Sequence, residues 1–119
     1  MDIKKISDQL SVSAQISPQQ VAELASAGFR SVICNRPDGE SPDQPSHQEI
    51  ESACLAQGLN FCHLPADSGK VLDSHGNEFG QLLKDLPGPV LAYCRTGTRS
   101  TTMWALSQST QLTPAQIID

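Results

Sequence analysis

The residue types best suited to chemistry lie together in one short stretch, where Cys94, Gly97 and Arg99 fall within six positions. The stretch reads LAYCRTGTRS over Leu91–Ser100, an apolar run followed by a turn and a helical pattern. In an open parallel sheet, ligands bind beyond the carboxyl ends of the strands, and Cys94 has that position. Gly97 permits a tight loop whose backbone N–H groups point inward, and the following helix adds its positive N-terminal end. The spacing therefore predicts an anion-binding loop around the Cys94 thiol.

The electric field of such a loop also acts on the thiol itself. A cysteine at a helix N-terminus beside arginines can have its pKa lowered from about 8.5 to roughly 3.5–7.5, which makes it largely thiolate at neutral pH. A thiolate in an anion-binding loop is a nucleophile for an anionic or electron-rich substrate. The alternative interpretation is a buried free cysteine at a strand end with two solvated arginines. The grouping of Cys, Gly, Arg and Ser between a strand and a helix favours the reactive site.

Length and charge restrict the classes of protein to which the chain can belong. Its 119 residues are the length of one domain, which we expect to span residues 1–119. Thirteen Asp and Glu against eight Lys and Arg give a net charge of −5, the wrong overall sign for nucleic acid or an anionic membrane. No apolar run approaches the 18 or so residues of a membrane span, and the first residues lack the apolar stretch of a signal peptide. We therefore expect a cytoplasmic protein whose anionic substrate is held by a local site.

The four cysteines, at positions 34, 54, 62 and 94, predict neither a disulfide framework nor a metal site. They include no C-x-x-C pair. Cys62 and His63 are neighbours on an expected strand, so their side chains point to opposite faces of the sheet and cannot share one metal ion. We expect no metal and no cofactor.

Strand and helix patterns alternate along the chain. Strands are expected, from their apolar and β-branched character, at residues 3–6, 10–13, 29–34, 59–64 and 89–93. Helices are expected at residues 17–27, 46–58, 74–86 and 100–108, with a further helix start at 113–114. Capping boxes at Ser17 with Gln20 and at Ser46 with Glu49 support the first two helices. The alternation predicts an α/β fold in three layers, in which helices cover both faces of a central, mainly parallel sheet.

The loop and its surroundings resemble two groups of known proteins. The heptapeptide Cys94–Ser100 resembles the C-R-x-G-x-R-S loop of single-domain rhodaneses, which are sulfurtransferases. The segments Gly28–Glu40, Ala53–Pro65 and Tyr93–Leu106 resemble the phosphatase-like domain of beta-lactamase-hydrolase-like proteins. This second resemblance covers nearly the whole chain and implies a fold like that of tyrosine and dual-specificity phosphatases, in a family in which sulfur transfer has become a favoured function. Related domains are joined to enzymes of sulfide oxidation, so the resemblance also implies such an enzyme as a candidate partner.

The position of the arginine distinguishes two chemistries. A tyrosine-phosphatase loop is C-x5-R, which requires arginine at position 100, where this chain has Ser100. Arg99 makes the loop C-x4-R, one residue shorter, so its amides should close more tightly around the cysteine and suit a persulfide sulfur better than a phosphoryl group. The main hypothesis is therefore a sulfurtransferase that moves sulfane sulfur through a Cys94 persulfide, from a small anionic or persulfide donor to a thiol acceptor.

The other residues of the loop have expected roles in this hypothesis. Cys94 is the nucleophile, and Arg99 with the loop amides holds the anionic donor. Ser100 hydrogen-bonds the thiolate or caps the following helix. The substrate-binding residues that we expect are Arg95, Thr96, Gly97, Thr98, Ser100 and Arg36.

Two alternatives remain open. The first is a phosphatase of the tyrosine or dual-specificity type, in which Cys94 attacks phosphorus and an acid protonates the leaving oxygen. Asp67 is its candidate acid, because it follows a strand 27 residues before Cys94, although a solvated turn aspartate beside Gly69 is the simpler interpretation. The second alternative is an anion-binding or thiol redox module without turnover.

Three further residues have two interpretations each. Arg36 either steers an anion toward the site or pairs with Asp38 or Glu40. Cys34 either resolves an oxidised Cys94 or belongs to the core. His63 either lies near the site or has a structural role. The sequence leaves the sulfur donor, the acceptor and the oligomeric state open.

Overall fold

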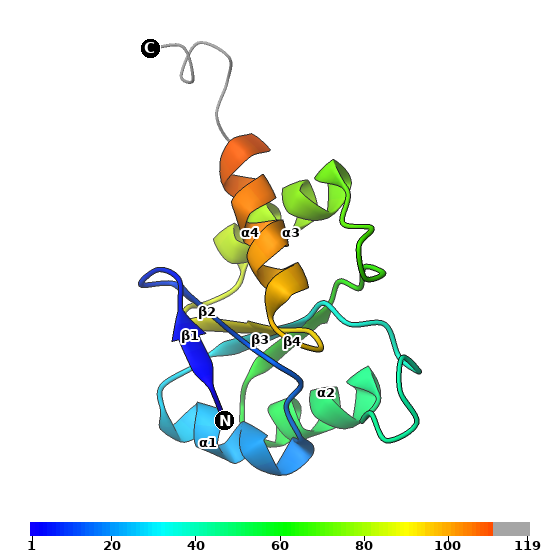
Figure 1. Cartoon of the computed structure of the whole chain (residues 1–119). Helices are drawn as coiled ribbons and strands as arrows, with labels where there is room; N and C mark the ends of the chain where they lie inside the picture. The colour runs from blue at the N-terminus through cyan, green and yellow to red at the C-terminus, as the bar shows by residue number, and fades with distance from the viewer. Residues whose placement is uncertain (111–119) are drawn as a thin grey trace.

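The computed structural model describes residues 1–110, with the side chains of residues 109 and 110 outside the description. Its five strands form one sheet in the order β1-β2-β5-β3-β4 (Figure 1). The strands are β1 (Ile3–Lys5), β2 (Leu10–Ser13), β3 (Ser31–Cys34), β4 (Asn60–His63) and β5 (Val90–Tyr93). β1 pairs antiparallel with β2, and the other three pairings are parallel. The mainly parallel sheet predicted from the sequence is confirmed.

Helices cover both faces of this sheet, as predicted. They are η1 (Pro18–Gln20), α1 (Val21–Ser26), α2 (His47–Ala56), α3 (Asp73–Asp85) and α4 (Thr98–Thr110). α1 and α2 lie against one face, and α3 and α4 against the other (Figure 1). Each face has its own apolar cluster, one with Phe79 and Met103 from α3 and α4, the other with Leu24 and Ile50 from α1 and α2. The fold is therefore three layers, α/β/α.

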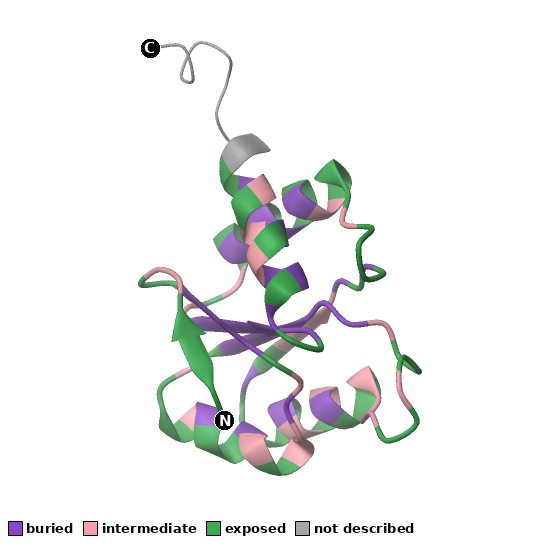
Figure 2. Ribbon diagram, viewed as in Figure 1, coloured by how far each residue is buried: buried purple, intermediate pink, exposed green. Residues whose placement is uncertain are grey.

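β5 is the central strand and carries the site at its end. All four of its residues are buried (Figure 2), as expected for a parallel strand covered on both faces. Tyr93 is in register with Ser13 of β2 on one side and with Cys34 of β3 on the other. The carboxyl ends of three strands therefore meet where Cys94 begins the next loop.

The helix starts follow local capping chemistry. At η1, the Ser17 hydroxyl accepts the Gln20 amide while the Gln20 side chain accepts the Ser17 amide, which is the predicted capping box. At α2, the Ser46 hydroxyl accepts the Glu49 amide at 3.2 Å. At α3, His75 Nδ1 accepts the Leu72 amide at 2.9 Å, so this helix begins slightly before the predicted position.

The structure differs from the sequence-based boundaries in two further ways. The strands are shorter by one or two residues, except for the four-residue β2. α4 begins at Thr98 rather than at residue 100, because the last residues of the Cys94 loop already have helical geometry. The helix start predicted at residues 113–114 lies outside the described residues. Within the described part of the chain, no helix is long and apolar enough to cross a membrane.

Candidate active site

Cys94 lies directly after β5, with its sulfur inside a ring of backbone amides. The residue is 1% exposed. The Gly97 amide donates to Sγ at 3.1 Å, and the amides of Thr96, Arg99 and Ser100 also hydrogen-bond the sulfur. Burial by itself raises the pKa of the Cys94 thiol, but these four hydrogen bonds outweigh burial and hold the pKa below its ordinary value. The loop thus stabilises a thiolate through its backbone.

Gly97 makes the ring geometrically possible. Its φ of +93° lies in the region that favours glycine, and an added Cβ would lie 3.5 Å from the backbone of Ser13 at the end of β2. The Gln15 amide donates to the Arg95 carbonyl at 3.3 Å, which ties the loop to the segment after β2. The end of β2 therefore supports the outside of the ring.

Arg99 is anchored on one side and open on the other. Its Nη1 donates to Glu40 Oε2 at 2.7 Å and to the Ala66 carbonyl at 2.9 Å, while Nη2 donates to Glu40 Oε1 at 2.8 Å. These contacts use three of the five guanidinium N–H groups, and the other two, on Nε and Nη2, form a second donor edge. The guanidinium also interacts with the Cys94 thiol. Arg99 can therefore hold Glu40 with one edge and offer the other to an anion beside the sulfur.

Arg36 pairs with Glu40, which was one of its two sequence-based interpretations. Its Nε donates to Glu40 Oε1 at 2.9 Å, and its other nitrogens donate to Gln15 and Ser41. The side chain is 4% exposed. The expected direct contact of Arg36 with substrate thus has no support in the geometry, because the guanidinium is buried against protein partners.

Glu40 links the two arginines and is a residue that sequence reasoning missed for this role. The ion pair with Arg99, and then the one with Arg36, holds the pKa of the Glu40 carboxyl below its ordinary value. The spacing of Arg36 and Glu40 was a usable signal for their pairing, since the residues are four apart. The pairing with Arg99 spans 59 positions and has no local sequence signal.

Ser100 serves the site through its amide, and its hydroxyl has a different partner from either predicted one. The hydroxyl donates to Asn35 Oδ1 at 2.8 Å, and Asn35 Nδ2 donates to the Leu64 carbonyl at 2.9 Å. The predicted hydrogen bond of Ser100 to the sulfur is thus made by its amide, whereas the predicted capping role is wrong, because α4 already begins at Thr98. The hydroxyl instead joins the start of α4 to the ends of β3 and β4, across 65 positions of sequence.

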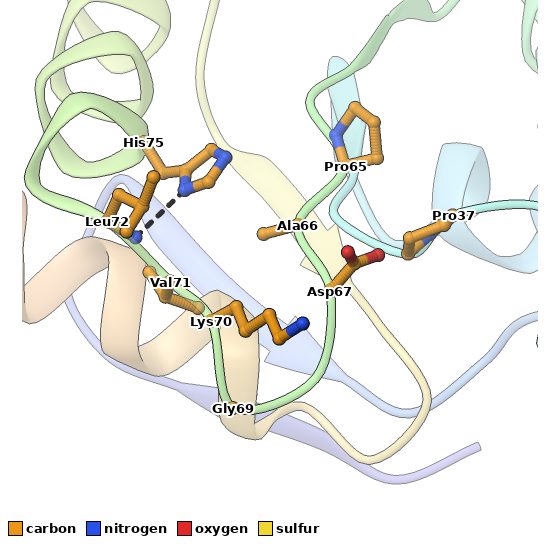
Figure 3. A pocket seen from close by; sticks show the side chains of 9 residues that line it. All are labelled: Pro37, Pro65, Ala66, Asp67, Gly69, Lys70, Val71, Leu72 and His75. Atoms are coloured by element: carbon orange, nitrogen blue, oxygen red, sulfur yellow. Dashed lines mark hydrogen bonds between the residues drawn. The ribbon is translucent and has the colours of Figure 1, made fainter.

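Asp67 lies in the loop between β4 and α3, one residue after the carbonyl of Ala66 that anchors Arg99. Its exposed side chain lines a cavity of about 660 Å³ together with Pro37, Lys70 and His75 (Figure 3). The Lys70 side chain extends toward the Asp67 carboxylate in this view. The structure thus brings Asp67 to the neighbourhood of Arg99, through the Ala66 carbonyl that precedes it, rather than into contact with Cys94.

A smaller cavity adjoins the Cys94 loop itself. Its volume is about 350 Å³. The cavity is lined by Ser68, Gly69, Val71, Arg95, Thr96, Thr98, Arg99 and Thr102. Arg95, Thr96 and Thr98 are exposed there, so these three expected substrate-binding residues lie at the mouth of the site.

The other cysteines have a different electrostatic environment. Burial raises the pKa of the thiols of Cys34 and Cys62, and it raises the pKa of Cys54 to about 12. Cys34 is 2% exposed, and its thiol donates to the Arg36 carbonyl at 3.3 Å. Among the cysteines, all within the described residues, only Cys94 has a lowered thiol pKa.

His63 has a structural role in this arrangement. Its Nε2 donates to the Arg36 carbonyl at 3.0 Å, and its ring stacks on His47 with the centroids 3.9 Å apart. His47 in turn pairs with Asp38 through Nδ1 at 2.6 Å. Over residues 1–110, no three His, Cys, Asp or Glu side chains gather in a way that could hold a metal ion.

Comparison with known proteins agrees with the resemblance of the sequence. The model of the phosphatase-like domain of beta-lactamase hydrolase-like proteins matches residues 2–111. The chain belongs to this family. It is 31% identical over 109 residues to a beta-lactamase hydrolase-like protein of Agrobacterium fabrum, and 32% identical over 108 residues to one of Xylella fastidiosa. The matches cover 92% and 91% of this chain and 25% of each relative, so the chain spans about a quarter of the length of these relatives.

Solved structures place this family member among phosphatase folds. A candidate phosphatase from Neisseria meningitidis matches with a TM-score of 0.87 and 33% identity, over 99% of this chain and 84% of that one. TpbA from P. aeruginosa matches with a TM-score of 0.59 and 23% identity, over 80% of this chain and 54% of that one, which shows the fold alone. The fold is thus that of cysteine-dependent phosphatases of the tyrosine and dual-specificity type. The family and the similar solved structures support the phosphatase alternative better than the sulfurtransferase hypothesis.

Proposed function

We propose that this family member is a cysteine-dependent phosphatase that hydrolyses phosphate monoesters through a Cys94 phosphocysteine. The observation that carries the proposal is the buried Cys94 sulfur, which accepts four backbone amides beside the open donor edge of Arg99. A thiol in this setting is ionised more readily than a free cysteine, and the surrounding donors are suited to bind an anionic substrate. The family and fold agree with this chemistry.

The reaction proceeds in two displacements. Cys94 thiolate attacks phosphorus, a P–S bond forms, and the P–O bond to the leaving group breaks while Asp67 gives its proton to the leaving oxygen. Water then attacks the phosphocysteine, Asp67 takes a proton from it, and inorganic phosphate leaves with the thiolate restored. The Nε and Nη2 edge of Arg99 binds two phosphoryl oxygens in both steps.

The loop amides change partners during this cycle. In the structure, the amides of Thr96, Gly97, Arg99 and Ser100 point at the sulfur. These are the donors that phosphoryl oxygens require once the P–S bond has formed, since the bond removes the thiolate charge. The ring therefore stabilises negative charge first on sulfur and then on the transferred group.

An aryl phosphatase assay tests the proposal. We expect the wild type to release phosphate from 4-nitrophenyl phosphate and Cys94→Ser to have no activity. Asp67→Asn should lower kcat more for phenyl phosphate than for 4-nitrophenyl phosphate, because a poorer leaving group depends more on the acid. Asp85→Asn, an exposed aspartate at the end of α3, is the matched control and should retain wild-type rates. Absence of phosphate release from both esters contradicts the proposal.

Sulfur transfer is the second candidate, and one observation favours it. The C-x4-R loop is one residue shorter than a C-x5-R loop, and its amides hydrogen-bond the sulfur atom itself. A ring of this size suits a persulfide. In this reaction Cys94 thiolate attacks the sulfane sulfur of thiosulfate, sulfite leaves, and a thiol acceptor then takes the sulfur. Thiosulfate sulfurtransferase activity with a Cys94 persulfide in mass spectrometry, unaffected by Asp67→Asn, would favour this candidate over the phosphatase.

A further inference from the structure

Two arginines share one carboxylate behind the candidate nucleophile. Glu40 accepts both Nη nitrogens of Arg99, at 2.7 and 2.8 Å, and also Nε of Arg36 at 2.9 Å. Arg36 and Arg99 are 4% and 8% exposed as side chains, and Glu40 is 22% exposed. The three side chains therefore form a network in which two largely buried positive charges share one partly exposed negative charge.

The charge balance of this network matters for the sulfur. A single Glu40–Arg99 pair is neutral overall, and its field beside Cys94 would be weak because the two charges largely cancel. With Arg36 included, the network carries a net charge of +1. Both guanidinium groups are largely buried, so their charge is less screened by water than that of surface arginines and can act on a neighbouring thiolate.

The anchors of Arg36 are partly independent of Glu40. Its Nη1 donates to Gln15 Oε1 at 2.9 Å, and its Nη2 donates to Ser41 Oγ at 3.3 Å. Its carbonyl accepts His63 Nε2 at 3.0 Å. Arg36 is thus held in place by Gln15, Ser41 and His63 besides Glu40, so its charge stays near the network when the Glu40 carboxylate is removed.

We propose that Glu40 and Arg36 are positioning residues of the Cys94 site, with separable effects. Glu40 orients Arg99 so that its second donor edge faces the sulfur, and Arg36 supplies the positive charge that Glu40 would otherwise cancel. The proposal rests on Cys94 being the nucleophile of the proposed function. It gives a role to Arg36, a buried arginine that binds Glu40 and is not among the residues lining the 350 Å³ cavity.

A purely structural role of Arg36 and Glu40 is the competing explanation. The two explanations differ in the direction in which loss of each residue changes the reactivity of Cys94. Replacement of a buried Arg–Glu–Arg triad by apolar residues in another protein left folding intact or improved stability, so such networks are not required for stability in general. A structural role predicts that loss of either residue impairs Cys94 in the same direction. The positioning role predicts opposite effects on the readiness of the thiol to ionise.

Other charged and titratable groups belong to the three segments that build the site. Arg95 and Arg99 belong to its own loop, Asp67 and Lys70 to the segment after β4, and Cys34 and Asp38 to β3 and the segment after it. All of these groups are the same in the variants compared below. Differences between the variants therefore report on Arg36 and Glu40.

The experiment measures the rate of alkylation of Cys94 by iodoacetamide between pH 5 and pH 9, with peptide mapping by mass spectrometry. Four proteins are compared: the wild type, Arg36→Met, Glu40→Gln and the double variant. At pH 6 we expect Arg36→Met to react roughly threefold more slowly and Glu40→Gln roughly threefold faster, with the double variant near the wild type. kcat/KM should nevertheless fall about tenfold in Glu40→Gln, because Arg99 loses its anchor.

Two controls keep the result decisive. Arg36→Lys retains the charge without the planar donor fork, so its alkylation profile should follow the wild type even if its stability falls. Should Arg36→Met fail to fold, Glu40→Gln is compared with Arg36→Lys instead. Cys94 should then be alkylated faster in Glu40→Gln than in Arg36→Lys at pH 6. The proposal would be overturned if the variants had the same alkylation profile as the wild type. It would also be overturned if Arg36→Met and Glu40→Gln both changed the alkylation rate in the same direction. Absence of turnover with either substrate class would contradict the proposed function alone, since alkylation needs no substrate.

Discussion

Two loops at the same edge of the sheet build the site in different ways. The loop after β5 acts through its backbone, because four of its amides contact the Cys94 sulfur while the side chains of Arg95, Thr96 and Thr98 are exposed. The segment after β3 acts through its side chains, because Arg36 and Glu40 hold Arg99. Apart from Cys94 and Arg99, the first loop should therefore tolerate changes of its exposed side chains without loss of the amide ring, whereas the second should not tolerate loss of Arg36 or Glu40.

The segment after β3 is also tied to its surroundings at both ends. The backbone N–H of Asn35 donates to the Tyr93 carbonyl at 2.8 Å, and the residue is fully buried. Farther along, Asp38 accepts the amide of His47 at 2.8 Å, at the start of α2. Glu40 lies between Asp38 and His47, the two residues that this hydrogen bond joins, so the segment can present its carboxylate to Arg99 in a defined position.

The largest expected effect tests the backbone-built loop at its centre. Cys94→Ser replaces the thiolate by a hydroxyl that stays protonated at neutral pH, so turnover should fall at least about a thousandfold. The measurement is kcat/KM for the substrate class that the wild type accepts. Cys62→Ser, a change on β4 outside the amide ring, is the control and should remain within about twofold. Retained activity in Cys94→Ser would contradict this prediction, because the amide ring would then enclose a residue that is not the nucleophile.

The next effect tests the side-chain-built segment. Asn35→Ala leaves the Ser100 hydroxyl and the Leu64 carbonyl without their buried partner, and should lower the free energy of unfolding by about 2–3 kcal/mol. Urea denaturation followed by circular dichroism measures the change. Asn77→Ala, at an exposed position of α3, should change stability by less than about 0.5 kcal/mol. Equal values for the two variants would show that the segment does not depend on its side chains.

A third prediction sharpens the contrast within the loop after β5. Gly97→Ala forces a Cβ onto a residue with φ +93° and should cost about 1–3 kcal/mol of stability together with a slower reaction of Cys94 at pH 6. Thr98→Ala, at the next position, removes an exposed side chain and keeps the backbone. It should change both quantities little. The measurements are urea midpoints and alkylation rates, and a larger effect from Thr98→Ala would mean that side chains build this loop too.

The smallest effect concerns the pH dependence of stability. The pKa of the Glu40 carboxyl is lowered in the folded chain, mainly by Arg99, below an ordinary value of 4.5. Its ion pairs therefore stabilise the fold fully above that ordinary value, and the contribution is lost as the pH falls through the lowered one. Relative to Glu40→Gln, the wild type should lose about 1 kcal/mol or less between pH 7 and pH 3, since the carboxylate is partly exposed. A difference in unfolding free energy that is flat over this range would contradict the prediction.

Much of the architecture was predictable because its signals are local. Alternating strand and helix patterns gave the parallel sheet and the three layers, and the Ser17 capping box was read correctly from four residues. The spacing of Cys94, Gly97 and Arg99 between a strand and a helix located the candidate nucleophile. The partner of the Ser100 hydroxyl was not predictable in this way, because that partner, Asn35, follows a strand 65 positions earlier.

The sequence by itself determined the order of the elements and the place where a reactive thiol follows β5, because hydrophobic periodicity, capping residues and glycine spacing act over a few neighbouring positions. Only the tertiary structure decided which carboxylate holds Arg99 and which arginine balances that carboxylate. These partners are brought together by the pairing of β3 with β5, and contacts between residues 59 positions apart depend on the packing of the whole sheet rather than on any local pattern.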